Sequence, residues 1–204
     1  MEYHKIETLY ERDAVTFKVK PGVFKNRTYT IPSRWHFTEK IDGTNIRAQW
    51  SGSALCFGGR TDNAQIHADL YKRLTELFTP EKMAAVFPDT QVVLYGEGYG
   101  PGIQKGGGDY GLFKDFILFD VLVDQKWWLN WEAIKDVAAK LGLLVVPSLG
   151  LMTLEVATDL VRAGFASALN GGKKQAEGLV GRTEEPLFDK KGHRLIVKLK
   201  TKDF

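Results

Sequence analysis

The sequence lacks the features that mark secreted, metal-stapled and membrane-spanning proteins. Its 204 residues include a single cysteine, Cys56, which excludes an intrachain disulfide and a cysteine-rich zinc site and favours a reducing compartment. No apolar run approaches the roughly 20 residues of a membrane span, and the first residues lack the apolar core of a signal peptide. We therefore expect a cytoplasmic protein with no membrane partner. Cys56 lies in an apolar stretch, where we expect a small buried side chain.

An excess of one charge sign is also missing. The formal net charge is only +3, which permits a polyanionic partner without indicating one. Hydrophobic residues at 44% and charged residues at 26% are ordinary for a globular protein, and no repeat or low-complexity tract is present. We expect one domain over residues 1–204, acting as a monomer.

Turn signals at short intervals separate segments with strand and helix periodicity. Alternating residues predict strands at 35–39 and 44–50 around the turn-prone Asp42-Gly43, which places Lys40 at a strand end. Helical spacing predicts helices at 66–78, just after Thr79, at 131–141 and, more weakly, at 154–165. Further strands are predicted at 91–95, 113–123, 178–182 and 194–200. The class is α+β, with antiparallel sheets flanked by helices.

The segment Glu39-Lys40-Ile41-Asp42-Gly43-Thr44-Asn45 holds a lysine beside a tight turn, with its amine able to face a cleft. By itself such a pattern is weak, because most lysines are solvated surface residues. Further polar or aromatic positions follow in order along the chain. They are Arg60 in FGGRTDN, Glu97 in LYGEGYG, Phe119 in FILFDVLV, Glu177 in AEGLVGR, and Lys198 and Lys200 in IVKLKTKDF.

These residue types suit a nucleophilic lysine. A lysine amine with a reference pKa of ~10.4 is protonated at neutral pH, so neighbouring cations must destabilise its charged form before it attacks phosphorus. Lys198 and Lys200, two residues apart on a strand, share one face and suit that role and the neutralisation of phosphates. An exposed basic edge strand explains their alternation equally well. Glu177 could hold a divalent cation.

Three other positions suit a nucleotide. Glu97, before glycines, suits a carboxylate that accepts hydrogen bonds from ribose hydroxyls. Arg60 follows two glycines and could bind ribose or phosphate oxygens through its fork of donors. Phe119 offers a face on which adenine could stack, although a core role within its apolar run is as plausible.

Taken together, the ordered positions from Glu39 to Phe204 resemble the motifs of the covalent nucleotidyltransferases: ATP-dependent DNA ligases, RNA ligases and capping enzymes. The resemblance implies the adenylation-domain fold of ligases, ATP as co-substrate and Mg²⁺ or Mn²⁺ as the metal. It implies roles for Lys40 as the adenylylated nucleophile, Glu39 near adenine, Arg60 and Glu97 at ribose, Phe119 in stacking, Glu177 at the metal, and Lys198 and Lys200 at the phosphates. Asn45 after Gly43-Thr44 is similar to the extension found in nick-sealing RNA ligases, and GEGYGPGIQKG is similar to their glycine-rich segment.

The resemblance implies an RNA ligase that joins 5′-phosphate and 3′-hydroxyl ends of RNA, or of DNA, through lysyl-AMP and an adenylylated 5′ end. A compact DNA ligase or capping core, or a non-catalytic nucleic-acid-binding module, remain alternatives. Only Thr201 to Phe204 follow Lys200, so we expect neither an OB-fold nor a helical C-terminal domain. The chain would then be a minimal enzyme or an excised domain.

Overall fold

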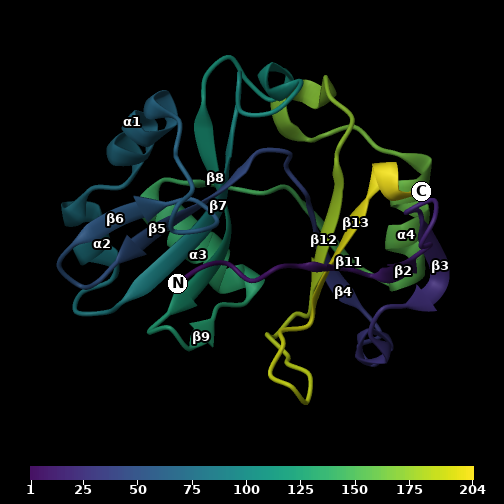
Figure 1. The fold of residues 1–204 in the computed structure, drawn as a ribbon. Coiled ribbons are helices and arrows are strands. Elements are labelled where there is room, and N and C mark those ends of the chain that lie inside the picture. The colour runs from purple at the N-terminus through teal and green to yellow at the C-terminus, as the bar shows by residue number, and fades with distance from the viewer. The chain divides into compact units, whose positions relative to one another are not determined.

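The computed structural model describes residues 1–204 apart from the side chain of Asn170. The chain divides into two compact units (Figure 1). Unit 1 consists of Met1–His4 and Asp42–Val146, and unit 2 consists of Lys5–Ile41 and Pro147–Phe204. We expected the whole chain to act as one adenylation domain, and it stays a prediction that the two units act together in this way.

Unit 1 is built on a six-stranded sheet whose main path runs β10-β8-β7-β5-β6, with β9 pairing to β8. All of its pairs are antiparallel except the short pair of β8 with β10. The strands are β5 (Thr44–Trp50), β6 (Leu55–Gly58), β7 (Val92–Tyr99), β8 (Asp115–Val123), β9 (Trp127–Trp128) and β10 (Leu144–Val145). The helices are α1 (Ala68–Leu77), α2 (Pro80–Val86), the 3-10 helix η2 (Gly107–Asp109) and α3 (Trp131–Leu141).

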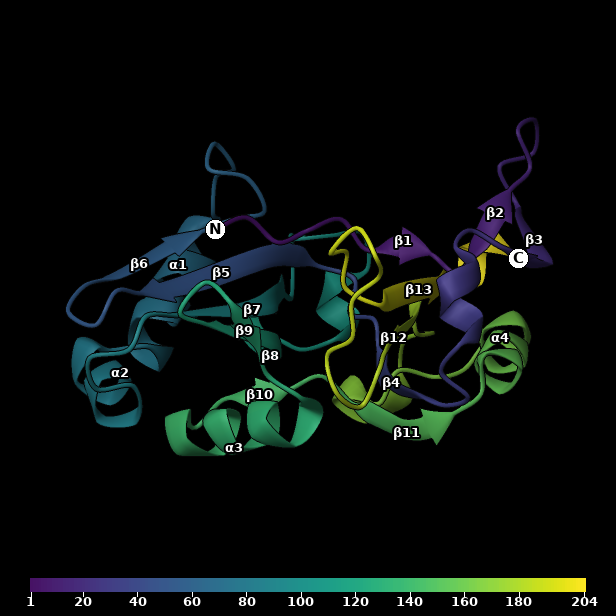
Figure 2. The ribbon, with the colours of Figure 1, turned by 90° about the horizontal axis from the view of Figure 1, so that it is seen from below.

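The two faces of this sheet differ in character. Helices α2 and α3 lie on one side of the sheet, and the N-terminal segment runs along the other (Figure 2). Residues paired across strands share a face, and successive residues alternate between faces. The helix-covered face therefore carries apolar side chains such as Ile46 and Leu94, whereas the other carries Asn45, Arg47 and Glu97.

Unit 2 contains a five-stranded sheet of order β1-β13-β12-β4-β11 and a two-stranded sheet of β2 and β3. The β1–β13 pair is parallel and the other pairs are antiparallel. The strands are β1 (Glu7–Thr8), β2 (Tyr10–Arg12), β3 (Val19–Phe24), β4 (Trp35–Glu39), β11 (Ser148–Met152), β12 (Gly178–Arg182) and β13 (Ile196–Lys200). The helices are α4 (Leu154–Ala163) and the 3-10 helices η1 (Arg27–Thr30), η3 (Leu169–Gly172) and η4 (Thr201–Asp203).

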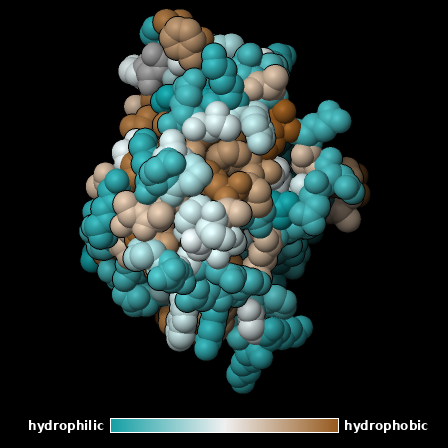
Figure 3. Space-filling view, turned by 90° about the vertical axis from the view of Figure 1, so that its left-hand side faces the viewer, coloured by the Kyte–Doolittle hydropathy of each residue, from teal (hydrophilic) through white to brown (hydrophobic). Residues whose placement is uncertain are grey.

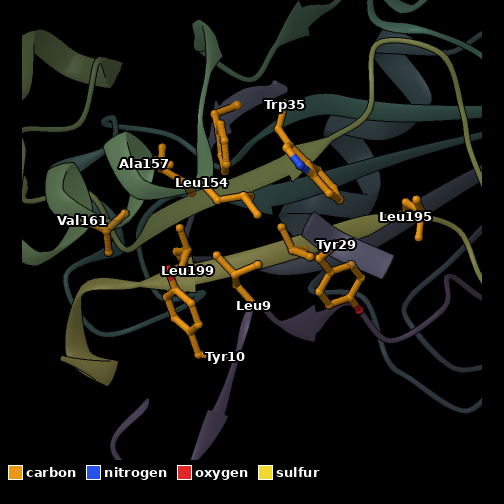
Figure 4. Close-up of a cluster of buried hydrophobic side chains, with 12 residues drawn as sticks. Leu9, Tyr10, Tyr29, Trp35, Leu154, Ala157, Val161, Leu195 and Leu199 are labelled. Carbon is orange, nitrogen blue, oxygen red and sulfur yellow. The ribbon is translucent and has the colours of Figure 1, made fainter. Parts of the chain in front are cut away.

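The core of unit 2 forms where α4 covers one face of the five-stranded sheet (Figure 4). Trp35 and Phe37 from β4 are fully buried there together with Leu179 from β12. Each such side chain contributes about 1.5–3 kcal/mol through burial, so this cluster holds the strand that leads to Lys40 in place.

Most predicted elements are confirmed. The strands at 35–39, 44–50 and 178–182 and the helix at 131–141 have the predicted bounds, and the helix at 154–165 ends two residues earlier, at Ala163. Asn130 caps the helix at 131–141 by accepting the N–H of Ala133, and Gly142 ends it with a φ of 70°. These local signals succeed because capping bonds are made within a few residues of the helix end.

Two expectations were wrong, and the strands that flank Asp42-Gly43 lie in different sheets, because β4 pairs with β11 and β12 whereas β5 pairs with β6 and β7. The strand predicted to end at Tyr95 continues to Tyr99. Gly96 is part of this strand because its lack of a side chain leaves room for the Phe116 ring, from which a Cβ at Gly96 would lie only 2.2 Å away. Cys56 is exposed, on a strand with a neighbour on only one side.

The surface is largely hydrophilic, with smaller hydrophobic patches between, on the face seen in Figure 3. Within the part of the chain that the structure describes, no helix has both the length and the apolar character needed to cross a bilayer.

Candidate active site

The three predicted site lysines lie on one face of the five-stranded sheet in unit 2. The register pairs Thr38 with Val180 and Val180 with Lys198, and it pairs Gly178 with Lys200. Lys40 follows the last residue of β4 and continues the ladder, because its N–H donates to the carbonyl oxygen of Gly178 at 2.9 Å. Lys40, Lys198 and Lys200 therefore project to the face opposite the core.

The alternative interpretation of Lys198 and Lys200 as a basic edge strand is wrong. Strand β13 has β12 on one side and β1 on the other, and Lys198 is itself paired with Thr8. The neighbouring strands leave both lysines only partly exposed.

Glu177 bridges two of the lysines. Its Oε2 accepts from Lys40 Nζ at 2.5 Å, and its Oε1 lies 2.6 Å from Lys200 Nζ. The Lys40, Lys200 and Glu177 side chains are 23%, 19% and 14% exposed. Ion pairs shielded from water to this extent are screened less than surface pairs. Lys40 is thus held among the predicted partners and not in bulk solvent.

The electrostatics of this cluster are unbalanced. Burial would raise the pKa of Glu177, but the positive charges of Lys40 and Lys200 outweigh burial and hold it below its ordinary value. Among the described residues no carboxylate forms an ion pair with Lys198. Burial, and then repulsion by Lys200 and Lys40, lowers the pKa of Lys198 to about 8. Two cationic groups therefore contact one carboxylate, and the ammonium group of Lys198 lies near both of them.

Gly178 allows this close arrangement. A Cβ at Gly178 would lie 1.9 Å from the carbonyl oxygen of Leu199, and its φ of 153° disfavours other residues. Only glycine lets β12 begin directly against β13 and so fixes Glu177 next to Lys200.

Glu39 lies on the opposite face of the sheet from Lys40. It is 2% exposed, and its Oε2 accepts the N–H of Ala168 at 2.9 Å. Its Oε1 is buried without a hydrogen-bond partner among the described residues. A buried carboxylate oxygen without a donor is costly, so this atom fits a ligand N–H.

Asn45 and Glu97 come together in unit 1. They are directly paired residues of β5 and β7 and share the face away from the helices. Asn45 Oδ1 is buried without a partner in the part of the chain that the structure describes. A Cβ at Gly43 would lie 2.2 Å from the carbonyl oxygen of Gly98, so glycine is needed where the chain meets the end of β7.

Arg60 and Phe119 occupy less regular positions in unit 1. Arg60 is exposed on the loop that follows β6. Phe119 is partly exposed at an irregularity of β8, because Tyr95 pairs with Asp120 and Gly96 pairs with Leu118. Phe119 is thus the extra residue of a β-bulge, a feature that often re-aims a side chain near a site.

Arg47 and Asp62 were missed in the sequence analysis. The buried Arg47 forms an ion pair with Asp62, on the loop that carries Arg60, and its Nε has no partner among the described residues. The i, i+2 spacing of Asn45 and Arg47 on one strand was the available signal, since it places both on one face.

A model of the RNA ligase family matches residues 33–200. The chain belongs to the RNA ligase family. That match includes every predicted site residue from Glu39 to Lys200. A search of the curated proteins finds no match.

Solved structures of Naegleria gruberi RNA ligase share the fold. A variant without ligand is 19% identical with a TM-score of 0.66, and the match covers 82% of this chain and 49% of that one. A variant with AMP and Mn is 17% identical with a TM-score of 0.69, covering 96% and 61%. The chain thus spans about half the length of the first of these. Its α+β fold is that of the RNA ligase nucleotidyltransferase domain, as expected.

Proposed function

We propose that this chain is an ATP-dependent RNA ligase that joins 5′-phosphate and 3′-hydroxyl ends through a lysyl-AMP intermediate on Lys40 and an adenylylated 5′ end. The observation that carries the proposal is the pairing of Lys40 and Lys200 with Glu177, with Lys198 close to both lysines, within the segment matched by the RNA ligase family. We propose further that the two units act as one adenylation domain.

The first step forms a phosphorus–nitrogen bond. Lys40 Nζ, having lost a proton, attacks the α-phosphorus of ATP, and the bond from that phosphorus to the pyrophosphate oxygen breaks. Lys198 and Lys200 neutralise the phosphate oxygens as pyrophosphate leaves. The AMP is then transferred to a 5′-phosphate, and a 3′-hydroxyl displaces it to seal the strand.

The nucleoside-binding roles rest on unpaired acceptors and on residue chemistry. Glu39 Oε1 accepts an N–H of adenine, and Asn45 Oδ1 accepts a hydrogen bond from the nucleotide. Glu97 and Arg60 bind ribose, and Phe119 stacks on adenine.

Glu177 is the proposed metal residue. The described residues include no cluster of three or more His, Cys, Asp or Glu that could enclose an ion. A single carboxylate fits Mg²⁺ or Mn²⁺ that keeps most of its waters and is bound by the phosphates as well. Such an ion, when bound, would supply positive charge at the α-phosphate. Because both oxygens of Glu177 contact ammonium groups, an ion held there would compete with Lys40 and Lys200 for this carboxylate.

ATP and a divalent ion are supported by likeness to the Naegleria enzyme, whose structures include ATP or AMP with Mn. RNA, rather than DNA, is supported by the family and by Asn45 after the lysine motif. A DNA ligase core, a capping core or a non-catalytic binding module would share the fold, so substrate tests must separate them.

Self-adenylylation tests the first step. The protein is incubated with ATP labelled at the α-phosphate, with and without Mg²⁺ or Mn²⁺, and covalent label is measured after denaturation. We expect label that requires the metal and is lost in Lys40→Ala. Lys140→Ala, on the exposed surface of α3, is the matched control and should label normally. Label that survives in Lys40→Ala, or its absence from the wild type under all conditions, would refute lysyl-AMP formation.

End joining tests the later steps. Nicked RNA duplex, single-stranded RNA, pre-adenylylated RNA and matching DNA substrates are compared with the same protein. We expect RNA ends to be joined. Preference for DNA ends or for GTP would favour the compact DNA ligase or capping alternative, and nucleic-acid binding without self-adenylylation would favour the binding module.

A further inference from the structure

The N-terminal segment Met1–His4 belongs to unit 1 and runs along the polar side of its sheet (Figure 2). Tyr3 is 7% exposed, and its hydroxyl donates to Asp120 Oδ2 at 2.7 Å. Asp120 is fully buried and directly follows Phe119. The segment is therefore tied to the strand residues next to the proposed adenine-stacking ring.

The ring of Tyr3 makes a second set of contacts. Its centroid lies 5.2 Å from that of Phe119, edge to face at 69°. It also lies 4.8 Å from Tyr95 and 5.8 Å from Trp128. Aromatic pairs within about 7 Å prefer such tilted geometries, so Tyr3 restricts how the Phe119 ring can turn.

Phe119 needs this restriction more than a regular strand residue does. As the extra residue of the bulge, it lies opposite no single Cα partner on β7. A bulged residue is left unpaired by the ladder, so side-chain contacts determine its direction.

The neighbouring residue Glu2 contacts the loop that carries Arg60. The N–H of Asp62 donates to Glu2 Oε1 at 3.1 Å, and the side chain of Asp62 pairs with the buried Arg47. The same short segment thus touches the surroundings of two proposed nucleotide-binding residues.

We propose that Tyr3 is a positioning residue of the nucleotide site, which holds Phe119 and Asp120 so that the Phe119 ring is preorganised to stack on adenine. This inference rests on the proposed function. Tyr3 takes no part in bond making. Its loss weakens ATP binding and leaves the chemistry at Lys40 largely intact, because preorganised contacts lower the cost of binding.

Two measurements test this inference. The dissociation constant of ATP is measured by equilibrium dialysis without divalent metal, and single-turnover self-adenylylation gives the half-saturating ATP concentration and the maximal rate. For Tyr3→Ala we expect both binding constants to weaken about tenfold, with the maximal rate changed less than about threefold. Tyr3→Phe, which keeps the ring, should stay within about threefold of the wild type in all three values.

The matched control is Tyr10→Ala. Tyr10 is 4% exposed, bonds Thr158 through its hydroxyl at 2.9 Å and packs on Phe24, all within unit 2. We expect it to lower stability while leaving the ATP constant of the folded protein unchanged. Tyr3→Leu, closer in volume, replaces Tyr3→Ala if the latter does not fold.

Three results would overturn the inference: an unchanged ATP constant in Tyr3→Ala or Tyr3→Leu, tighter binding, or an equal effect of Tyr10→Ala. Failure of the proposed function would look different. The wild type would then bind ATP without forming covalent AMP, and the dialysis comparison would still decide the role of Tyr3. A wild type that binds no ATP would overturn both.

Discussion

Replacing Lys198 by methionine should make the protein more stable while impairing adenylylation. Lys198 is partly buried, has no carboxylate ion-pair partner among the described residues and lies near Lys40 and Lys200. Its pKa falls from the ordinary 10.5 to about 8. At ~1.4 kcal/mol per pKa unit, the charged form destabilises the fold by about 3 kcal/mol as an upper limit. Partial solvent screening reduces the expected gain for Lys198→Met to about 1–3 kcal/mol near neutral pH.

The pH dependence gives a sharper test of the same cost. Below pH 8 Lys198 is protonated in both folded and unfolded states, so the full cost is present. Between pH 8 and 10.5 the folded protein releases the proton while the unfolded chain keeps it, and wild-type stability rises relative to the variant. The advantage of Lys198→Met should therefore shrink by more than half between about pH 7 and about pH 9.5.

The assay is urea denaturation followed by both circular dichroism and tryptophan fluorescence at the two pH values. Taking the difference between wild type and variant removes the titration of the groups that do not interact with Lys198. Lys191→Met, an exposed lysine of the same unit, is the control and should show neither the gain nor its pH dependence. A destabilised Lys198→Met, or a gain independent of pH, would refute the argument that the partly buried charge of Lys198 destabilises the fold.

Other predictions concern Glu177, two glycines and a helix cap. Glu177→Gln should reduce self-adenylylation at least about 100-fold and lower the free energy of unfolding by about 1–3 kcal/mol at neutral pH. Because folding lowers the pKa of Glu177, this difference in the free energy of unfolding should disappear as the pH falls below 4.5. Gly43→Ala should destabilise the protein by about 1–3 kcal/mol in urea denaturation, because the new Cβ would lie 2.2 Å from the carbonyl oxygen of Gly98. Gly111→Ala is the control and should change stability little, because the nearest atom to its new Cβ lies 3.9 Å away. Thr153→Ala removes the N-cap of α4 and should cost about 1 kcal/mol by the same method, without changing adenylylation per folded molecule.

Local signals in the sequence predicted the elements well, and they failed where distant partners decide. Alternation and capping residues located β4, β5, α3 and β12, because each signal acts over a few residues. The turn signal at Asp42-Gly43 separated the two strands but did not identify their partners, because β5 bonds to β7, whose residues lie about fifty positions further along the chain. Pairing of this kind depends on the packing of whole sheet faces, which no short pattern specifies.

The candidate site shows the same division. The i, i+2 spacing of Lys198 and Lys200 correctly placed these two on one face, and the strand register of the structure adds Lys40 to that face. The bridge from Lys40 to Glu177 spans 137 positions and could not be read from either segment alone. The contact of Tyr3 with Asp120 spans 117 positions and carries no motif at the tyrosine. Residues that act by packing against a site are therefore found only from the folded structure.

The positive charge of the lysine cluster explains both the folding stability that the cluster costs and its proposed role in binding phosphates. Lys40 and Lys200 share the carboxylate of Glu177, and Lys198 adds a third ammonium group that is attracted by Glu7 without forming an ion pair with it. Lys40, Lys198, Lys200 and Glu177 therefore carry an excess of positive charge when all four are ionised. A protein that only needed to fold would gain by replacing Lys198 with an apolar residue. The excess becomes favourable when an anion binds, because phosphate oxygens offset the repulsion that lowers the Lys198 pKa. The unfavourable charge of the free protein and its proposed attraction for a triphosphate are thus two consequences of the same arrangement.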